Sequence, residues 1–160
     1  MAVIKIVIAV VILWGGAAEV VSSDLESIRE AAAQGDAEAQ YQLGDIYYYG
    51  EGVSKNYTRA FEWYRKSANQ GYAPAQNNLG WMYDEGRGVA RDDRKAVEWY
   101  RKSANQGHAA AQYNLGWMYY NGEGVARDYW KAVEWFRKAA EQGHASAQNK
   151  LRELEQKISR

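Results

Sequence analysis

The sequence repeats itself every 36 residues, and this period constrains the fold more than any other feature. Leu-Gly occurs at 43–44, 79–80 and 115–116, and the same step links three tryptophans, Trp63, Trp99 and Trp135. In frames of 38–73, 74–109 and 110–145, units 1 and 2 share 20 of 36 residues and units 2 and 3 share 26. Periods of this length are typical of solenoids, in which one supersecondary unit is stacked several times.

Each unit has the pattern of two helices. In unit 1, Ala39, Leu43 and Tyr47 lie at helical spacing and predict an A helix over about 39–49. A Gly-x-Gly-Val turn follows at 50–53, and the pattern of 58–69 predicts a B helix that ends at Gln70-Gly71, with Gly71 in the left-handed conformation. Half units at 19–37 and 146–160 flank the three full units and serve as caps. The chain is therefore predicted to be an all-α superhelix of about eight helices.

Three glycines fall inside predicted A helices, at positions 44, 80 and 116. A helical glycine costs roughly 0.5–1 kcal/mol relative to alanine, so we expect each to mark the closest approach of an A helix to its B helix. On the B helices, three Glu–Lys pairs at i, i+4 predict ion pairs on a solvated face. They are Glu62–Lys66, Glu98–Lys102 and Glu134–Lys138.

Residues 1–18 differ from the repeats. One charge, Lys5, precedes an apolar run from Ile6 to Trp14, and Gly16-Ala17-Ala18 offers a site of small residues for cleavage. This layout is typical of a secretory signal peptide, and the run is shorter than the roughly 20 residues that span a bilayer. We therefore expect cleavage after Ala18 and an exported protein, periplasmic or secreted. An uncleaved N-terminal anchor and a simple buried segment are the alternatives.

Composition excludes several classes of function. The chain has 20 Lys+Arg, 20 Asp+Glu and no cysteine. Zero net charge provides no general field for nucleic acid or for an anionic membrane. The absence of cysteine removes disulfides, thiolate metal sites and a cysteine nucleophile.

No motif predicts catalysis, a cofactor or a metal. The two histidines, His108 and His144, occupy one position of successive units, too far apart in a solenoid to share a metal, so we expect structural or surface roles. The Gly-x-Gly turns follow a helix and lack the Lys-Ser/Thr of a phosphate loop. The adjacent acids at 84–85 and 92–93 are interpreted as solvated turn residues, and no serine has a histidine placed to activate it. We predict that the protein is not an enzyme.

The repeated motifs resemble those of the Sel-one-like repeat (SLR) family, a relative of the tetratricopeptide repeat. The matching segments of unit 3 are Ala-Gln-x-x-Leu-Gly-x-x-Tyr at 111–119, Gly-x-Gly-Val at 122–125, Lys-Ala-x-x-Trp-Phe at 131–136 and Ala-x-Gln-Gly-x-Ala at 140–145. The resemblance covers about residues 25–158. It implies a right-handed superhelix whose A helices line a concave face, and a scaffold or adaptor role in protein complexes. Some cysteine-rich members are described as β-lactam hydrolases, but their disulfide framework is absent here.

The resemblance also indicates which side chains line the concave face. They are the A-helix positions that vary between units, and they are rich in aromatic, acidic and amide groups with no Lys or Arg. Unit 1 contributes Tyr41, Asp45, Tyr48 and Tyr49; unit 2 contributes Asn77, Trp81, Asp84 and Glu85; unit 3 contributes Tyr113, Trp117, Tyr120 and Asn121. Such a surface suits a protein or peptide, especially a segment that bears Lys or Arg.

Four alternatives stay open at the level of the sequence. Aromatic platforms beside amides also suit sugar rings, so a glycan-binding module of the cell wall is the second hypothesis, and a β-lactam hydrolase is a third. Trp81 and Trp117 could instead pack between successive A helices and only stiffen the superhelix. Self-association through the same aromatic groups is a further use of this face.

Overall fold

The computed structural model describes the backbone of residues 16–158 and the side chains of residues 24–156. The described chain forms eight helices and no other regular element. They are α1 (Gly16–Ala33), α2 (Ala37–Tyr49), α3 (Tyr57–Asn69), α4 (Ala73–Glu85), α5 (Asp93–Asn105), α6 (Ala109–Asn121), α7 (Tyr129–Glu141) and α8 (Ala145–Ile158). The predicted all-α architecture with a period of 36 is confirmed.

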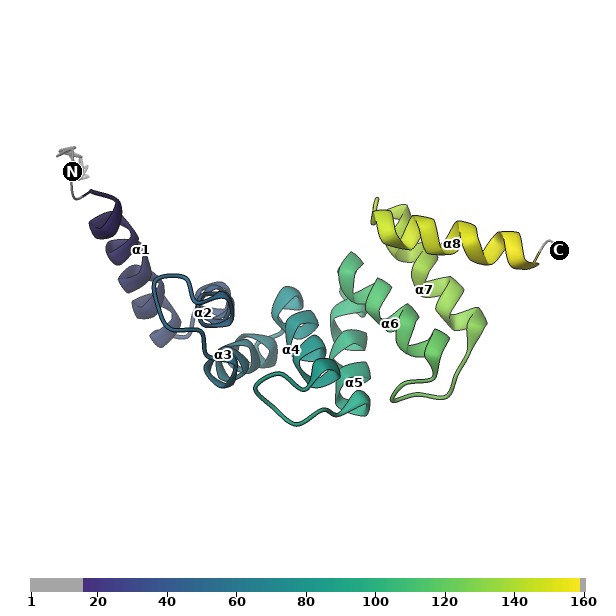
Figure 1. Ribbon diagram of the computed structural model, residues 1–160, viewed down its shortest axis with the longest axis horizontal. Helices are drawn as coiled ribbons and strands as arrows, with labels where there is room; N and C mark the ends of the chain where they lie inside the picture. The colour runs from purple at the N-terminus through teal and green to yellow at the C-terminus, as the bar shows by residue number, and fades with distance from the viewer. Residues whose placement is uncertain (1–15, 159–160) are drawn as a thin grey trace, which may run out of the picture.

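Consecutive helices pack against one another in a single curved row, with the two ends of the row raised on the same side (Figure 1). The A helices are α2, α4, α6 and α8, and the B helices are α3, α5 and α7. The predicted signal peptide lies outside the described residues except for its last three, which begin α1. Among the described helices, none is both long enough and apolar enough to cross a membrane.

Glycine allows each A helix to lie against an aromatic ring of its B helix, as expected. A Cβ on Gly44 would lie 2.5 Å from Tyr64 Cδ1, and one on Gly116 would lie 2.7 Å from Phe136 Cε1. Tyr64, Tyr100 and Phe136 are all buried. A methyl group at these positions has no room, so the close approach of the two helices explains the helical glycines.

A glutamine network joins each unit to the one before it. Gln76 of α4 donates to the carbonyl of Ala68 in α3 (3.1 Å) and accepts from Gln106, which caps α5 (2.7 Å). The same two bonds recur at Gln40 and at Gln112. Because buried amides must be hydrogen-bonded, this network fixes the stacking of successive units.

The helix ends agree with the predicted turns. Gly71 has a φ of +93° just beyond α3. Each B helix begins with an acidic or amide cap, for example Asp92, whose side chain accepts from the backbone N–H of Lys95 at 3.0 Å. Both histidines cap A helices through Nδ1, with His108 accepting from Ala111 N–H and His144 from Ala147 N–H, each at 3.3 Å. Their predicted structural role is thus a helix cap.

The lysines of the three predicted Glu–Lys pairs each lie over the tryptophan three residues earlier. The distances from Nζ to the ring centroid are 3.7, 3.9 and 4.2 Å for Lys66, Lys102 and Lys138. Lys138 also forms an ion pair of 2.7 Å with Glu134. A cation–π contact at i, i+3 and an ion pair at i, i+4 have similar strength on an exposed face, so the i, i+4 spacing alone does not determine which lysine forms the ion pair.

Candidate functional site: the aromatic face of the A helices

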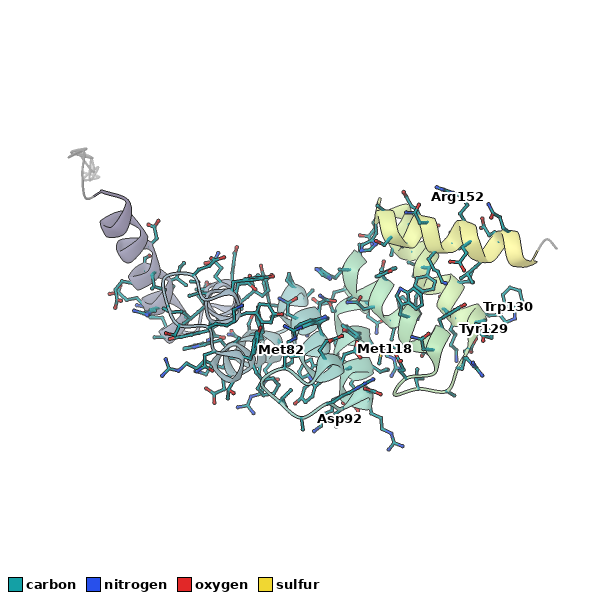
Figure 2. All side chains as sticks on the ribbon, viewed as in Figure 1. Met82, Asp92, Met118, Tyr129, Trp130 and Arg152 are labelled. Atoms are coloured by element: carbon teal, nitrogen blue, oxygen red, sulfur yellow. The ribbon has the colours of Figure 1, made fainter. Side chains whose placement is uncertain are left out.

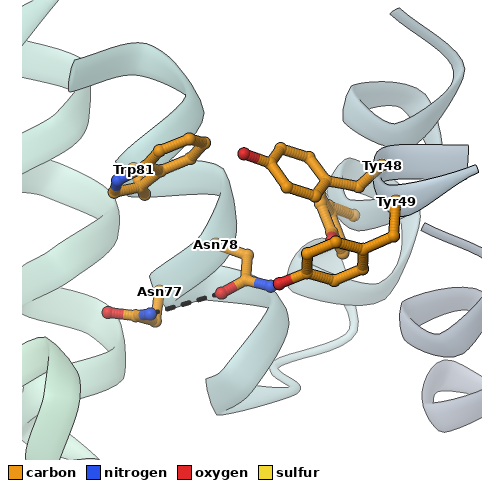
Figure 3. A pocket seen from close by; sticks show the side chains of 6 residues that line it. Tyr48, Tyr49, Asn77, Asn78 and Trp81 are labelled. Carbon is orange, nitrogen blue, oxygen red and sulfur yellow. Dashed lines mark hydrogen bonds between the residues drawn. The ribbon is translucent and has the colours of Figure 1, made fainter. Parts of the chain in front are cut away.

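A cleft of about 230 Å³ opens between α2 and α4. Tyr48 and Tyr49 of α2 lie on one side, and Trp81, Asn77 and Asn78 of α4 lie on the other (Figure 3). The Tyr48 and Trp81 rings are edge to face, with centroids 5.6 Å apart, while Tyr49 is 61% exposed. Aromatic rings and amide groups from two neighbouring units therefore share one open surface.

A carboxylate lies beneath this cleft. The hydroxyl of Tyr64, which also lines the cleft, donates to Asp45 Oδ1 at 2.5 Å. Partial burial raises the pKa of Asp45, and the Tyr64 and Tyr41 hydroxyls oppose this because they stabilise the carboxylate. Burial, together with the negative charge of Asp45, raises the pKa of Tyr41 to about 12. Both tyrosines are thus neutral donors at neutral pH.

The second acid–tyrosine pair lies in the next unit. Tyr100 donates to Asp84 Oδ2 at 3.3 Å, and burial raises the pKa of Asp84. In unit 3 the corresponding B-helix residue is Phe136, which has no hydroxyl, and the A helix offers no acid there because Trp117 and Tyr120 occupy both positions. Units 1 and 2 therefore have both an acid on the A helix and a tyrosine hydroxyl on the B helix, and unit 3 has neither.

A cation from outside the predicted set reaches the rim of the cleft. The Arg87 guanidinium lies 5.0 Å from the Trp81 ring centroid and 5.5 Å from that of Tyr57. It donates to the Tyr48 and Tyr57 hydroxyls, each at 3.3 Å. No Lys or Arg occupies the predicted A-helix positions of this face, but the turn after α4 supplies an arginine to the same rings.

The face of unit 3 forms a second aromatic group. Tyr113, Trp117 and Tyr120 succeed one another along α6, and the His144 ring stacks on Tyr113 with centroids 4.7 Å apart. Lys150 of α8 lies over this group, with Nζ 4.7 Å from the Trp117 centroid and 4.3 Å from that of Tyr120. A lysine of the last half unit thus covers part of the predicted face.

Some of the predicted partner-binding residues lie together in the structure, and others lie apart at the helix ends. The two aromatic groups are bridged by amides, because Asn114 of α6 donates to Asn77 Oδ1 at 3.0 Å. Trp81 and Trp117 are half-buried, so each serves packing with part of its ring and leaves the rest open. Glu85 and Asn121 are exposed at the ends of their helices, and Asn121 donates to Glu123.

Four residues of this face were missed: Tyr64, Asn78, Arg87 and Lys150. Asn78 occupies the repeat position of Asn114, and identity between units was interpreted as scaffold rather than surface. Arg87 stands where units 1 and 3 have Glu51 and Glu123, so a charge reversal between units was the available signal. Within residues 24–156, no group of three or more His, Asp or Glu side chains is placed to hold a metal ion.

Helix hairpins stacked with their A helices along one face define a tetratricopeptide-like α-solenoid. The Sel1 repeat model matches residues 37–72, 73–108 and 109–144. These matches cover more than half of the chain, and the chain therefore belongs to the Sel1 repeat (SLR) family. Repeats of this family usually form binding scaffolds.

Two solved structures are similar over most of the chain. One is c5321, described as a protective antigen of uropathogenic Escherichia coli with an SLR fold: 45% identity, 82% of this chain and 28% of that chain, TM-score 0.80. The other is a Sel1 repeat protein from Oxalobacter formigenes: 42% identity, 81% of this chain and 98% of that chain, TM-score 0.74. A Sel1-like protein of Schizosaccharomyces pombe is 51% identical over 39 residues, which is 24% of this chain and 6% of that protein. The chain thus spans only a small part of two of these relatives.

Proposed function

We propose that this chain is a non-catalytic scaffold that binds a protein or peptide segment on the aromatic face of its A helices. The observation that carries the proposal is the α2–α4 cleft, where Tyr48, Tyr49 and Trp81 stand open above a carboxylate and two amides. Rigid aromatic side chains with polar edges are enriched at protein interfaces. Two units contribute to the cleft, so a bound segment would run across the repeat boundary.

The charge layout supports a partner that bears Lys or Arg. Helices α2, α4 and α6 carry four acids and no Lys or Arg, whereas α3, α5 and α7 each carry more basic than acidic residues. The four acids are Glu38, Asp45, Asp84 and Glu85. Arg87 and Lys150 illustrate how a cation can lie on the rings of this face. A basic segment would therefore meet both ring faces and carboxylates.

A displayed library of random peptides tests this proposal. Wild-type protein is the bait, and the variant Tyr49→Ala/Asn77→Ala removes two side chains from the cleft with little loss of packing. We expect enriched peptides to contain Lys or Arg and to bind the variant at least about tenfold more weakly, since interface aromatics often dominate binding. Arg65→Ala, on the exposed part of α3, is the matched control and should bind normally. Enriched peptides that bind all three proteins equally contradict the cleft as the site.

A glycan-binding module is the second candidate, favoured by the amides of Asn77 and Asn78 below the Trp81 ring (Figure 3). Titration with soluble peptidoglycan fragments while tryptophan fluorescence is recorded separates the two functions. A saturable change that Trp81→Tyr abolishes supports glycan binding, and no change excludes it. Turnover of a chromogenic β-lactam above the buffer rate would support the hydrolase alternative and overturn the non-catalytic assignment.

Export is part of the same proposal. It rests on the layout of residues 1–18 and is compatible with the description of the E. coli relative as a protective antigen. Mass spectrometry of the protein from cells should give a mature N-terminus at Glu19. An intact Met1 would favour an uncleaved N-terminal anchor.

A further inference from the structure

Two aromatic side chains project from the start of α7, at the C-terminal end of the solenoid. Trp130 is 75% exposed and Tyr129 is 52% exposed, and Figure 2 shows the Trp130 ring directed away from the ribbon. With Tyr49, they are the exposed large hydrophobic residues of the described chain. Neither belongs to the α2–α4 cleft, and an exposed tryptophan next to an exposed tyrosine indicates a contact surface.

The repeat itself reveals what covers this surface in the other units. The start of α3 is covered by the next unit's turn, since a Cβ on Gly88 would collide with the Tyr57 backbone. The start of α5 is covered in the same way by Gly124, which lies against the Asp93 backbone. After α7, the described chain continues only as α8, so no such turn lies on Tyr129. Among the described residues, the surface at α7 is the one copy without a glycine turn, and the other two copies each receive one.

In the first of these contacts the turn carries an arginine. Arg87, beside Gly88, stacks near the Tyr57 ring and donates to the hydroxyls of Tyr48 and Tyr57. Those two rings have centroids 5.1 Å apart. Both hydrogen bonds leave one guanidinium nitrogen, Nη1, while the planar guanidinium lies over the Tyr57 ring. A planar, weakly hydrated cation lies on an aromatic face better than a lysine ammonium does.

Unit 3 repeats this pair of tyrosines. Tyr120 and Tyr129 occupy the positions of Tyr48 and Tyr57, and their ring centroids are 5.3 Å apart. Where unit 2 places Trp81, α8 places Glu153, which accepts from Lys150 Nζ at 3.2 Å. A carboxylate therefore stands at the position from which Trp81 contacts Arg87, and it already holds one cation, Lys150.

Two cations lie near this surface, and one of them has a counterpart in unit 1. Arg127 lies over Tyr129 with a distance of 5.7 Å to the ring centroid, and Lys55 holds the corresponding place at 6.0 Å from Tyr57 while Arg87 is bound. A cation at this place is therefore compatible with an arginine in the site. Lys150 covers Tyr120, so an incoming guanidinium meets Tyr129 and Trp130 first.

We propose that the surface formed by Tyr120, Tyr129, Trp130 and Glu153 binds an arginine-bearing glycine turn of a partner protein, in the way that Tyr48 and Tyr57 hold Arg87. The partner is defined by this chemistry: an arginine followed by a glycine that can approach the start of α7. The surface shares Tyr120 with the aromatic face of unit 3 but no residue with the α2–α4 cleft, so the two sites can be tested separately.

The probe is the capped tetrapeptide Gly-Arg-Gly-Val, which is the sequence of residues 86–89. The full chain is labelled with 5-fluorotryptophan, and Trp130→Thr assigns the Trp130 fluorine signal; Thr58 holds this position in unit 1, so the variant should fold normally. We expect a saturable shift of the Trp130 signal with the arginine peptide. The lysine analogue should bind about twofold to tenfold more weakly because its ammonium lacks the planar face that lies on the ring, and the glutamate analogue should not bind. A shift of the Trp81 signal would report binding in the α2–α4 cleft, so the Trp130 signal alone tests the surface at α7.

Tyr129→Phe keeps the ring and removes one acceptor, so it should weaken the arginine peptide about twofold to tenfold without changing the thermal melting curve. The proposal is wrong if the arginine peptide causes no saturable shift of the Trp130 signal. It is also wrong if the lysine and glutamate analogues shift this signal as much as the arginine peptide does. The Trp130 signal could instead move with protein concentration alone, and sedimentation could show a dimer that Trp130→Thr dissociates. These two results together would assign the surface to a second copy of this chain and would also overturn the proposal.

Discussion

The N-terminal and C-terminal parts of the aromatic face have the same backbone and different chemistry. At α2 and α4, buried tyrosines of the B helices donate to Asp45 and Asp84, and Arg87 lies on the rim. At α6, the B-helix ring belongs to Phe136, the face is formed by Tyr113, Trp117 and Tyr120, and the cation is Lys150. The difference shows that the repeat fixes where a ring meets a glycine and leaves the outer layer of the face free to vary.

The comparison also explains where the acids occur. A buried hydroxyl needs a partner, and Tyr64 and Tyr100 each find a carboxylate on the A helix. The two carboxylates occupy different repeat positions, 45 and 84, which lie about one helical turn apart once the 36-residue step is removed. Either turn of the A helix can satisfy the hydroxyl. The position of each of these two carboxylates on the A helix is therefore explained by the B-helix tyrosine that donates to it.

The largest effect should be common to both parts. Tyr64 and Phe136 are 2% and 0% exposed, and each fills the space beside a helical glycine. Replacing either by alanine leaves a cavity, and we expect a loss of about 3–5 kcal/mol in the free energy of unfolding. Urea denaturation followed by circular dichroism measures it. A variant that loses less than about 1 kcal/mol would show that its unit does not depend on the ring.

Adding a methyl group at the helical glycine should destabilise the N-terminal part more than the C-terminal part. Gly44→Ala and Gly116→Ala both press on a ring, and overpacking costs about 1–3 kcal/mol. Tyr64 is tied to Asp45 by its hydroxyl and cannot move aside freely, whereas Phe136 has no hydroxyl to hold it. We therefore expect Gly44→Ala to lower the melting temperature more than Gly116→Ala. In a Tyr64→Phe background, the loss in melting temperature caused by Gly44→Ala should come closer to that caused by Gly116→Ala. Equal melting temperatures for the two single glycine variants would contradict this account.

The scaffold was predictable from the sequence because its constraints recur. Gly44 and its counterparts appear three times, the Gln-Gly turns appear four times, and each has one physical reason that the structure confirms. The fold class, the succession of helices and the close approach at the glycines all follow from them.

The finished chemistry of the face was not predictable in the same way. Arg87 reaches the aromatic rings from the turn after α4, and Lys150 reaches them from α8, where it stands at the repeat position of Asn78 and Asn114. Long basic side chains lay their aliphatic stems along a surface and place the charge several ångströms from the backbone, so helical spacing does not locate their ends. A single residue that differs between units, such as Arg87 opposite Glu51 and Glu123, is the kind of signal that deserves weight in a repeat protein.

Removal of the Tyr64 hydroxyl should make unit 1 resemble unit 3, which has Phe136 in this place, and should leave Asp45 without one of its hydrogen-bond donors. Tyr64→Phe leaves Asp45 partly buried with one donor fewer, and we expect a loss of about 1–2 kcal/mol at neutral pH. The pKa of Asp45 is already raised by burial and should rise further, because the lost hydrogen bond stabilised the carboxylate. The charged form is then the costly one, so the difference from wild type should shrink as pH falls through the pKa of folded Asp45. Carboxyl NMR titration and urea denaturation at several pH values test both statements. The same difference at every pH would show that Asp45 is not involved.

The smallest expected effect concerns the helix caps between the two parts. Burial lowers the pKa of His108 below its usual value of 6.5, so the unfolded chain binds a proton at a pH where the folded chain does not. Stability is therefore expected to fall as pH drops from about 6.5 through the pKa of folded His108. His108→Tyr introduces the residue that unit 1 has at this position, Tyr72, which starts α4 without a side-chain cap bond. The variant should be slightly less stable at pH 8, because it loses the bond from Ala111 N–H, and its stability should decline less steeply between pH 7 and pH 5. Unfolding free energies across this range, with NMR titration of the His108 ring, decide the matter, and parallel curves for the two proteins would rule out His108 as the group that titrates.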